Sequence, residues 1–259
     1  MVKPNKNKRG ERKEDFNVIY GAVPVIESLR SGRRKLQKVL IAETAAGKSI
    51  AEIVSLTGKN GVRLERVSKR VLDNYFDEQV NHQGVLAFGA AVDYFDADVL
   101  ISELANNPHA FCLILDGVED PRNLGAILRT AEAAGVFGVF IPERRAVGLT
   151  DTVIKASAGA AEFLKIARVT NINRLIEELK ALNVWVIGTD GSAETTYDEW
   201  DWKQPSALVV GNEGTGLHRL TSEKCDVLVR IPMLGKIGSL NVSVAAGVIM
   251  FEAVKQRRG

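Results

Sequence analysis

The second half of the chain alternates strand-like runs that are apolar at nearly every position with helix-like runs. The strand-like runs are FCLILDGV, GVFGVFIP, VWVIGTD, ALVVGNE and VLVRIP, and the helical patterns between them include NLGAILRTAEAAG and INRLIEELKALN. A strand without polar alternation is buried on both faces, like a parallel strand between two helix layers. The pattern predicts an α/β fold with a mostly parallel sheet. Ligands of such sheets bind beyond the carboxyl ends of the strands, so the loops to inspect start at Asp116, Gly188, Gly211 and Pro232.

The first part of the chain predicts a smaller α/β unit. The helix-like runs are VPVIESLRSG, SIAEIVSLTG and SKRVLDNYF, and the strand-like runs are KVLIA, VRLERV and GVLAFGAAV. DADVLISELANNP then predicts a connecting helix that stops before Pro108. We therefore expect a basic arm over residues 1–15, an α/β domain over 16–95, a linker helix over 96–108 and a second α/β domain over 109–259.

Composition excludes several classes of protein. The longest mostly apolar stretch, Val242 to Phe251, is far shorter than the ~20 residues that a membrane-spanning helix needs. The charged N-terminus is not followed by an apolar region, so it does not predict a secretory signal. Cys112 and Cys225 form neither a disulfide framework nor a metal-binding pattern. We expect a reduced, cytoplasmic protein with no metal and no membrane partner.

Positive charge is concentrated at a few places. Residues 1–13 hold six basic side chains against the single acid Glu11, an arrangement typical of arms that contact a polyanion. A second cluster follows the first predicted helix and includes Arg33, Arg34 and Lys35. These three side chains are candidate RNA contacts. The alternative for each cluster is a solvated surface.

Two glycine-containing segments resemble nucleotide-binding loops without matching them. AAGKS, residues 45–49, has Ala42 where a P-loop requires its first glycine. GNEGTG, residues 211–216, places its second glycine wrongly for a dinucleotide pyrophosphate. The second segment still predicts a ligand loop lined by backbone.

The segment from Asp116 to Gly135 predicts a helix that starts at the end of a strand. Asn123 is the expected N-cap, and the apolar stripe that starts at Leu124 is the expected buried face. Arg122 and Arg129 lie together on the opposite side. Both are surface arginines on pattern alone, but the start of a helix beyond a strand is suited to phosphate, which makes Arg122 a candidate RNA contact.

The last segment, residues 231–254, predicts a glycine-bent loop and a helix that is apolar nearly all round and hence deeply buried. Ser239 or Asn241 is expected to cap that helix. The three histidines, His82, His109 and His218, stand in no recognisable relation to a nucleophile. We expect them to be structural or solvated, with His82 the one that could face a substrate.

Three motifs taken together resemble those of the SpoU (TrmH) group of SPOUT RNA methyltransferases. They are NLGAILRT (123–130), LVVGNEGTGL (208–217) and IPMLGKIGSLNVSVA (231–245). The N-terminal runs IYGAVPVIESLRSG and HQGVLAF are similar to the ribosomal-protein-like RNA-binding domain of the RlmB subgroup, which methylates 23S ribosomal RNA. The resemblance implies a trefoil-knotted C-terminal domain and a homodimer.

The resemblance also implies an activity and a set of site residues. The implied reaction moves a methyl group from S-adenosylmethionine to a ribose 2′-oxygen, in a guanosine of 23S ribosomal RNA or, alternatively, in tRNA. By matched position the cofactor would lie against Thr189, Gly211, Ile231 and Leu240. The carried-over catalytic and positioning residues are Asn123, Arg129, Glu213, Ser239 and Asn241.

The role of Arg129 has two interpretations. The family proposal makes this arginine the base that takes the 2′-hydroxyl proton, but arginine normally stays protonated. On physical grounds we favour a phosphate-binding, electrostatic role, with Glu213 and Asn123 holding the guanidinium in place.

Two other classes remain open on the sequence. A nucleotide-dependent oxidoreductase would explain the parallel sheet, although the chain lacks G-x-G-x-x-G after the first strand of that sheet. A non-catalytic RNA-binding protein would keep the basic arm but would tolerate loss of Arg129 and Glu213, and both are present.

Overall fold

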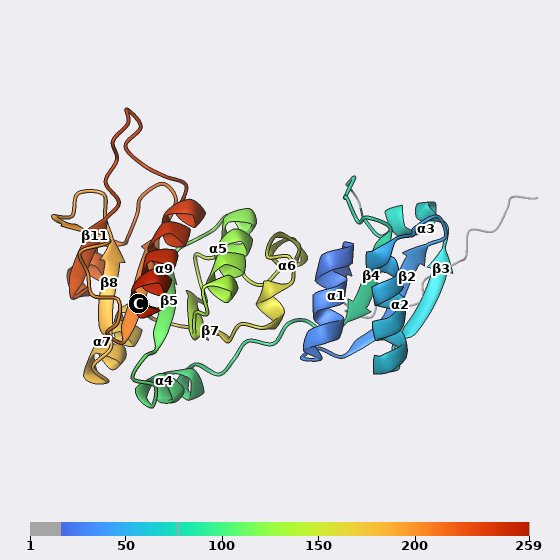
Figure 1. Cartoon of the computed structure of the whole chain (residues 1–259), viewed down its shortest axis with the longest axis horizontal. Helices are drawn as coiled ribbons and strands as arrows, with labels where there is room; N and C mark the ends of the chain where they lie inside the picture. Colours follow the sequence, from blue (N-terminus) through green and yellow to red (C-terminus); the bar gives the residue numbers. More distant parts are fainter. Residues whose placement is uncertain (1–16, 77, 259) are drawn as a thin grey trace, which may run out of the picture.

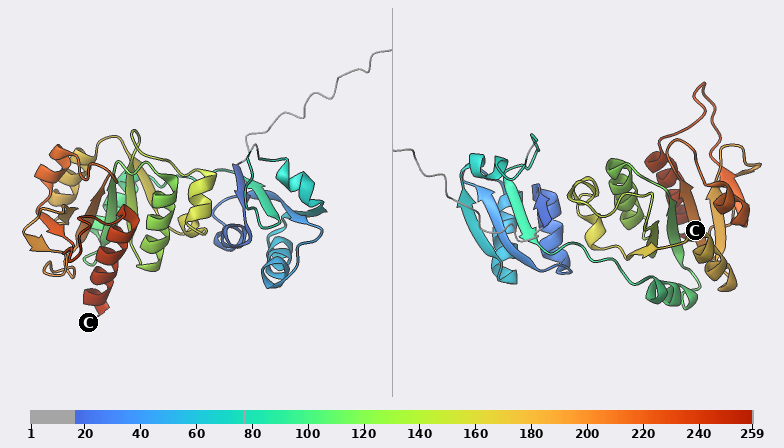
Figure 2. Two further views of the ribbon diagram at one scale, coloured as in Figure 1. Left: turned by 90° about the horizontal axis from the view of Figure 1, so that it is seen from above. Right: turned by 180° about the vertical axis from the view of Figure 1, so that it is seen from behind.

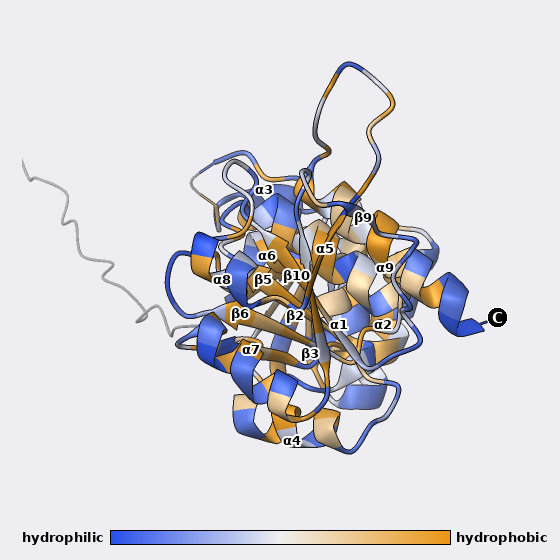
Figure 3. Ribbon diagram, turned by 90° about the vertical axis from the view of Figure 1, so that its left-hand side faces the viewer, coloured by the Kyte–Doolittle hydropathy of each residue, from blue (hydrophilic) through white to orange (hydrophobic). Residues whose placement is uncertain are grey.

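The computed structural model describes residues 17–76 and 78–258, which form two α/β units arranged side by side (Figure 1; Figure 2). The basic arm expected over residues 1–15 lies outside the described residues. Hydrophobic residues are concentrated in the strands, and hydrophilic residues are frequent in the helices and loops around them (Figure 3). The α/β fold expected from the sequence is confirmed.

The N-terminal unit is a four-stranded sheet with three helices. Its elements are β1 (Asn17–Tyr20), α1 (Ala22–Ser31), β2 (Leu36–Ala42), α2 (Lys48–Asn60), β3 (Arg63–Val67), α3 (Lys69–Asp73) and β4 (Val85–Gly89). The strand order is β1-β4-β2-β3, and only β2 and β3 run parallel. The sequence analysis did not predict β1, and α3 is shorter than the helix predicted from SKRVLDNYF. Gly32 ends α1 with a φ of 63°, as its position after the helix suggests.

The C-terminal unit is built on a seven-stranded parallel sheet. Its elements are α4 (Ala97–Ala105), β5 (Phe111–Asp116), α5 (Pro121–Ala133), β6 (Gly138–Pro142), α6 (Asp151–Ala156), the 3-10 turn η1 (Ala160–Glu162), β7 (Ile166–Val169), α7 (Ile172–Ala181), β8 (Trp185–Thr189), β9 (Thr195–Thr196), β10 (Ser206–Gly211), α8 (Arg219–Lys224), β11 (Val227–Arg230) and α9 (Val242–Arg258). The order is β7-β6-β5-β10-β8-β11-β9. Every residue of the neighbouring strands β5 and β10 is buried, as their continuous apolar sequences predict.

The helix expected to link the domains packs on the second sheet. Leu100 and Leu104 of α4 are buried in the core that also holds residues of β5 and β7. Gly138 of β6 lies so close to Leu100 that an added Cβ would approach its side chain to 2.8 Å. The helix therefore contributes to the core of the C-terminal unit.

The start of α5 differs from the sequence expectation. Asp120, and not Asn123, caps the helix: its carboxylate accepts hydrogen bonds from the backbone N–H groups of Arg122 (2.7 Å) and Asn123 (2.8 Å). Because Asp120 satisfies these two donors, the side chain of Asn123 is available for contacts outside the helix.

The last helix also differs from its prediction of deep burial. Ala246, Ile249 and Met250 of α9 are buried, but Val244 and Phe251 are 50% and 49% exposed. The prediction of deep burial was wrong. A helix that is apolar all round is buried only if other elements cover every side of it, and the described chain covers one side only.

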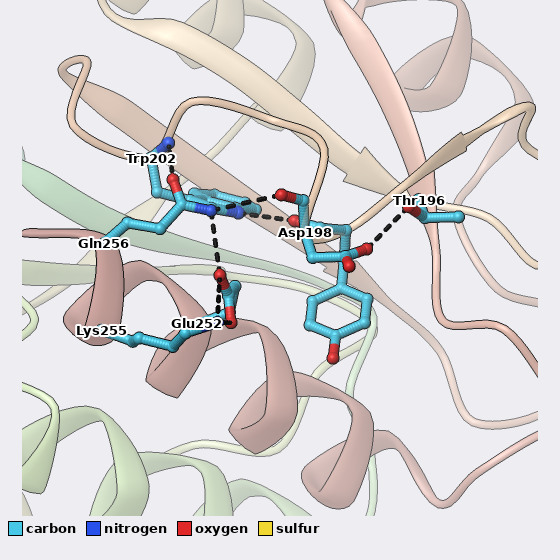
Figure 4. Close-up of polar contacts among 7 residues, drawn as sticks. Thr196, Asp198, Trp202, Glu252, Lys255 and Gln256 are labelled. Atoms are coloured by element: carbon cyan, nitrogen blue, oxygen red, sulfur yellow. Dashed lines mark hydrogen bonds and ion pairs between the residues drawn. The ribbon is translucent and has the colours of Figure 1, made fainter.

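Polar contacts hold the C-terminal half of α9 against the chain between β9 and β10 (Figure 4). Gln256 accepts a hydrogen bond from the backbone N–H of Trp202 (3.0 Å) and donates to the carbonyl oxygen of Asp198 (3.4 Å). Arg257 donates to the carbonyl oxygen of Trp202 (2.7 Å). Trp202 itself is fully buried, so this end of α9 is anchored to the C-terminal core.

The two units meet at an interface that contains buried charge. Nε of Arg34 lies 3.0 Å from Oε1 of Glu162, with side chains 3% and 0% exposed, although the N–H is not aligned for a hydrogen bond. Arg33 donates to the carbonyl oxygens of Glu162 (3.3 Å) and Leu164 (2.8 Å). Arg34 is therefore not available to RNA, and the prediction that it contacts RNA is wrong. Arg33 and Lys35 are both exposed, but the Arg33 guanidinium already donates hydrogen bonds at this interface.

Candidate functional site

A cavity of about 430 Å³ opens at the carboxyl ends of β8, β10 and β11, the edge where ligands of parallel sheets bind. It is lined by all four residues that the sequence analysis expected at the cofactor: Thr189, Gly211, Ile231 and Leu240. Glu213 and Ser239 line it as well. Three of the four loops that the strand pattern singled out meet here, and the loop after β11 rises from this edge (Figure 1).

The GNEGTG segment forms a small hairpin over the cavity. Asn212 and Gly216 exchange backbone hydrogen bonds of 2.9 and 3.0 Å. The Asn212 side chain donates to the carbonyl oxygen of Gly117 (2.8 Å) and accepts from the N–H of Gly214 (2.8 Å). A Cβ on Gly211 would come within 2.2 Å of the Gly216 backbone. Glycine is therefore required at position 211 for the hairpin to close. The sequence analysis did not reveal this requirement.

The cavity carries one carboxylate that the sequence analysis missed. Asp190 follows β8 and accepts hydrogen bonds from the Ser192 hydroxyl and backbone N–H, both at 2.7 Å. The hydroxyl contact, followed by the backbone contact, lowers the pKa of Asp190. The side chain is thus held ionised beside the cavity. Its place directly after a predicted strand and beside Gly191 is the signal that could have found it.

Three of the expected catalytic residues meet at the mouth of the cavity although they are far apart in the sequence. The Asn123 amide donates to Oε1 of Glu213 (3.0 Å), and the Asn241 amide donates to Oδ1 of Asn123 (3.0 Å). Asn241 also accepts from the backbone N–H of Ser243 (2.9 Å), which caps α9. A chain of directed hydrogen bonds therefore joins the three sequence motifs.

Both arginines of α5 are exposed, as the helix pattern predicts. Among the described residues, neither Arg122 nor Arg129 has a side-chain hydrogen bond or ion pair. The expectation that Glu213 and Asn123 hold Arg129 is not met, because these two side chains bond to one another. The guanidinium of Arg129 is thus free to contact a ligand.

A histidine–aspartate pair lies at the end of β5, behind the hairpin. Asp116 is 4% exposed, and its two oxygens contact Nδ1 and the backbone N–H of His218, both at 2.9 Å. An added Cβ on Gly117 would approach the His218 ring to 3.2 Å. The sequence analysis found no partner for His218, because the two residues of the pair are 102 positions apart.

The described residues contain no group of three or more histidine, cysteine, aspartate or glutamate side chains suited to a metal ion. No helix in the same part of the chain is long and apolar enough to cross a membrane.

The fold and the site together define a two-domain RNA methyltransferase. Residues 110–251 match the model of the SpoU rRNA Methylase family, and residues 18–95 match the model of the RNA 2′-O ribose methyltransferase substrate-binding domain. The chain belongs to the SpoU family, so the family resemblance seen in its three motifs is confirmed.

Relatives match over nearly the whole chain. A Bacillus subtilis protein, YacO, whose name places it in the TrmH family of tRNA/rRNA methyltransferases, is 46% identical over 94% of this chain and 97% of its own. An AdoMet-bound rRNA methyltransferase from Sinorhizobium meliloti has a TM-score of 0.74 at 27% identity, covering 93% of this chain and 87% of that one. A structure described as an RNA 2′-O ribose methyltransferase has a TM-score of 0.77 at 29% identity, covering 93% and 89%.

Proposed function

We propose that the chain transfers a methyl group from S-adenosylmethionine to a ribose 2′-oxygen of RNA. The observation that carries the proposal is the cavity beneath the hairpin. Its floor is apolar, with Val210 and Val242, while the ionised Asp190 and the loop backbone supply polar partners. Such a mixture suits a ligand that combines a base, sugar hydroxyls and a cationic group. The related rRNA methyltransferase of Sinorhizobium meliloti, bound to AdoMet, supports the same cofactor.

The cofactor, when bound, supplies the electrophilic methyl group, and the residues of this chain align and activate the acceptor. In-line displacement requires the 2′-oxygen to be held along one direction. The Glu213–Asn123–Asn241 chain presents a fixed set of amide and carboxylate groups at the mouth of the cavity. Ser239, on the same rim, adds a hydroxyl. These residues would orient the ribose and its neighbouring phosphate.

In our proposal Arg129 acts electrostatically. Its guanidinium is exposed and unpaired among the described residues, so it can bind the phosphate next to the target ribose and stabilise negative charge that develops on the 2′-oxygen. Arg122, about two helical turns away on α5, would bind a further phosphate. The alternative, in which Arg129 is the base, requires a deprotonated guanidinium, which is strongly disfavoured.

For the RNA target we propose a guanosine of 23S ribosomal RNA. Support comes from the N-terminal domain, which matches the substrate-binding model over residues 18–95, and from the similarity of its sequence to the RlmB subgroup. The name of the Bacillus subtilis relative includes both tRNA and rRNA, so tRNA is the second candidate. We further propose that the reaction takes place in the cytoplasm.

We also propose that the protein works as a homodimer. Val244 and Phe251 on α9 are half exposed, and the loop that leads into α9 carries Leu234 (99% exposed) and Ile237 (75% exposed). A second copy that covers this surface would remove apolar area from water.

Two measurements test the proposed function. Calorimetric titration with S-adenosylmethionine and with NAD should show binding of the first only, since binding of NAD would favour the oxidoreductase. Mapping of 2′-O-methyl groups on RNA from cells with and without the protein should then identify one missing modification in 23S ribosomal RNA. Cofactor binding without any missing methyl group would contradict the proposed target, and absence of both would favour a non-catalytic RNA-binding protein.

A further inference from the structure

A second cavity lies in the N-terminal domain, away from the methyltransferase site. It has a volume of about 560 Å³ and opens beyond the carboxyl ends of β2 and β3, the parallel pair of that sheet. Ala42, Ala45 and Val80 give it apolar walls, and Thr44, Lys69 and Asp73 give it polar ones. Its size lies within the range of pockets for small organic ligands, about 300–1,000 Å³.

One wall of this cavity is fixed by His82, both of whose ring nitrogens are hydrogen-bonded. His82 is 3% exposed, its Nδ1 accepts a hydrogen bond from the N–H of Gly84 (3.0 Å), and its Nε2 therefore donates to Oδ1 of Asp73 (2.9 Å). The ring also stacks on Phe76. Gln83 and Gly84 follow with φ angles of 54° and 77°. A left-handed non-glycine residue costs free energy and persists only when its surroundings fix it.

The same wall is fastened to the methyltransferase domain. Nζ of Lys155, on α6, donates to the carbonyl oxygen of Asn81 (2.7 Å) and lies 4.7 Å from the centre of the Tyr20 ring. Burial lowers the pKa of Lys155. The Gln83 amide oxygen accepts from the N–H of Ala22, at the start of α1. The cavity is thus held in a fixed relation to the catalytic domain.

We propose that this cavity binds one unpaired nucleotide of the RNA substrate, an inference that rests on the proposed function. The apolar walls suit the faces of a base, Thr44 and Asp73 can bond to its edge, and the exposed Lys69 can bind its phosphate. A concave pocket admits a base that is turned out of a loop or bulge, whereas the bases of a duplex are stacked out of reach.

The position of the cavity agrees with this occupant. Residues 79–84, which form one wall, and the loop between β11 and α9 lie along the same long edge of the molecule (Figure 1). An RNA that lies along this edge meets both sites. The N-terminal cavity then selects RNA that has an unpaired nucleotide at a set distance from the methylated ribose.

Binding of RNA by variants of the full chain tests the proposal. The probes are a short single-stranded oligoribonucleotide of mixed sequence and the duplex of the same sequence, compared at one salt concentration. Thr44→Val removes a hydroxyl without changing charge, and Lys69→Ala removes a cation. The matched control is Lys59→Ala, which removes a likewise exposed cation in the last turn of α2.

We expect Thr44→Val and Lys69→Ala each to weaken single-strand binding by about threefold to tenfold, as for loss of one hydrogen bond. Duplex binding should change less than twofold, and Lys59→Ala should leave the ratio of the two affinities unchanged. The KM for RNA should rise in both pocket variants while kcat stays the same. Melting temperatures measured in parallel show that the variants are folded.

Two results would overturn the proposal: unchanged single-strand affinity in Thr44→Val, or equal losses for single strand and duplex in Lys69→Ala. Failure of the proposed function is distinguishable. If the chain transfers no methyl group but the pocket variants lose single-strand affinity, the nucleotide site stands and the methylation proposal fails. If methyl transfer proceeds with unaltered KM in both variants, the nucleotide site fails alone.

Discussion

The domain interface and helix α5 of the C-terminal unit both contain arginines, but their environments are opposite. At the interface Arg34 is 3% exposed and paired with a fully buried Glu162. On α5 Arg122 and Arg129 are exposed, and within residues 17–76 and 78–258 neither has a side-chain partner. Basic residues of similar appearance in the sequence therefore serve stability in one region and remain available to a ligand in the other.

The difference also appears in the electrostatics. Burial, which outweighs attraction between the two charges, lowers the pKa of Arg34 and raises the pKa of Glu162. An ion pair in such a place is sensitive to loss of either partner, because the remaining charge is left without compensation. An exposed arginine carries no such cost, so its replacement should affect ligand chemistry and not folding.

The largest effect is expected at the interface. Glu162→Ala should lower the free energy of unfolding by about 3–5 kcal/mol, because it leaves Arg34 as an uncompensated buried charge. Replacement of both residues by methionine should recover most of that loss. Denaturant unfolding of the single and double variants measures both values. A single variant as stable as wild type would show that the interface is not a buried ion pair.

The same pair makes a prediction about pH. The folded pKa of Glu162 lies above its ordinary value of 4.5. A carboxyl group of this kind stabilises the fold fully below its unfolded pKa, and that contribution is lost as pH rises through the folded pKa. Wild type should therefore lose stability relative to Glu162→Gln as pH increases from about 4.5. Parallel stability curves would contradict the raised pKa.

The next effect is expected at Arg129, where activity and stability should separate. Arg129→Ala should lower the single-turnover rate of methyl transfer by roughly 10²-fold or more while stability changes by less than about 0.5 kcal/mol. Arg174→Ala, an exposed helix arginine on α7, is the control and should keep full activity. Full activity in Arg129→Ala would show that Arg129 has no role in methyl transfer and is an ordinary solvated surface residue.

Arg129→Lys distinguishes the two roles. A phosphate-binding role predicts partial activity with a pH dependence close to wild type, because lysine keeps the charge. A role as base predicts that the alkaline limb of the pH profile moves to lower pH, since lysine titrates below arginine. The single-turnover pH profile of the variant is the deciding measurement.

A smaller effect is expected at Asn123. Asn123→Ala removes the hydrogen bonds to Glu213 and Asn241, and we expect methyl transfer to slow by about tenfold as these groups lose their fixed orientation. Asn106→Ala, which removes an exposed contact at the end of α4, should have no effect on rate. Equal rates in the two variants would show that the hydrogen-bond chain does not position the site.

The smallest effect is expected at the two cysteines, Cys112, which is buried in β5, and Cys225, which is partly buried after α8. Burial raises the pKa of Cys112 and of Cys225 to about 12. At about pH 8 both should stay protonated and resist alkylation until the chain unfolds, because the thiolate is the reactive form. Reaction of either thiol in the native protein, followed by mass spectrometry, would show that the C-terminal core opens locally.

Some of this architecture follows from the sequence alone. Continuous apolar runs such as FCLILD and SALVVG have no polar face, so they can only be strands covered on both sides. Helix ends marked by glycine at 32 and 135 are local too, since both residues adopt positive φ. Residues of the second and third family motifs line the cavity, because these motifs contain the loops that follow β10 and β11.

Other features depend on which residues are neighbours in space. The Asn123–Glu213 contact spans 90 positions and the Arg33–Leu164 contact 131. A periodicity argument sees only neighbours within a few residues, so it could not tell the buried Arg34 from the exposed Lys35, nor predict that one side of α9 stays uncovered. Local sequence determined the elements and the chemistry that they can carry, whereas the packing of distant segments decided which charged groups are buried and which are left for a ligand.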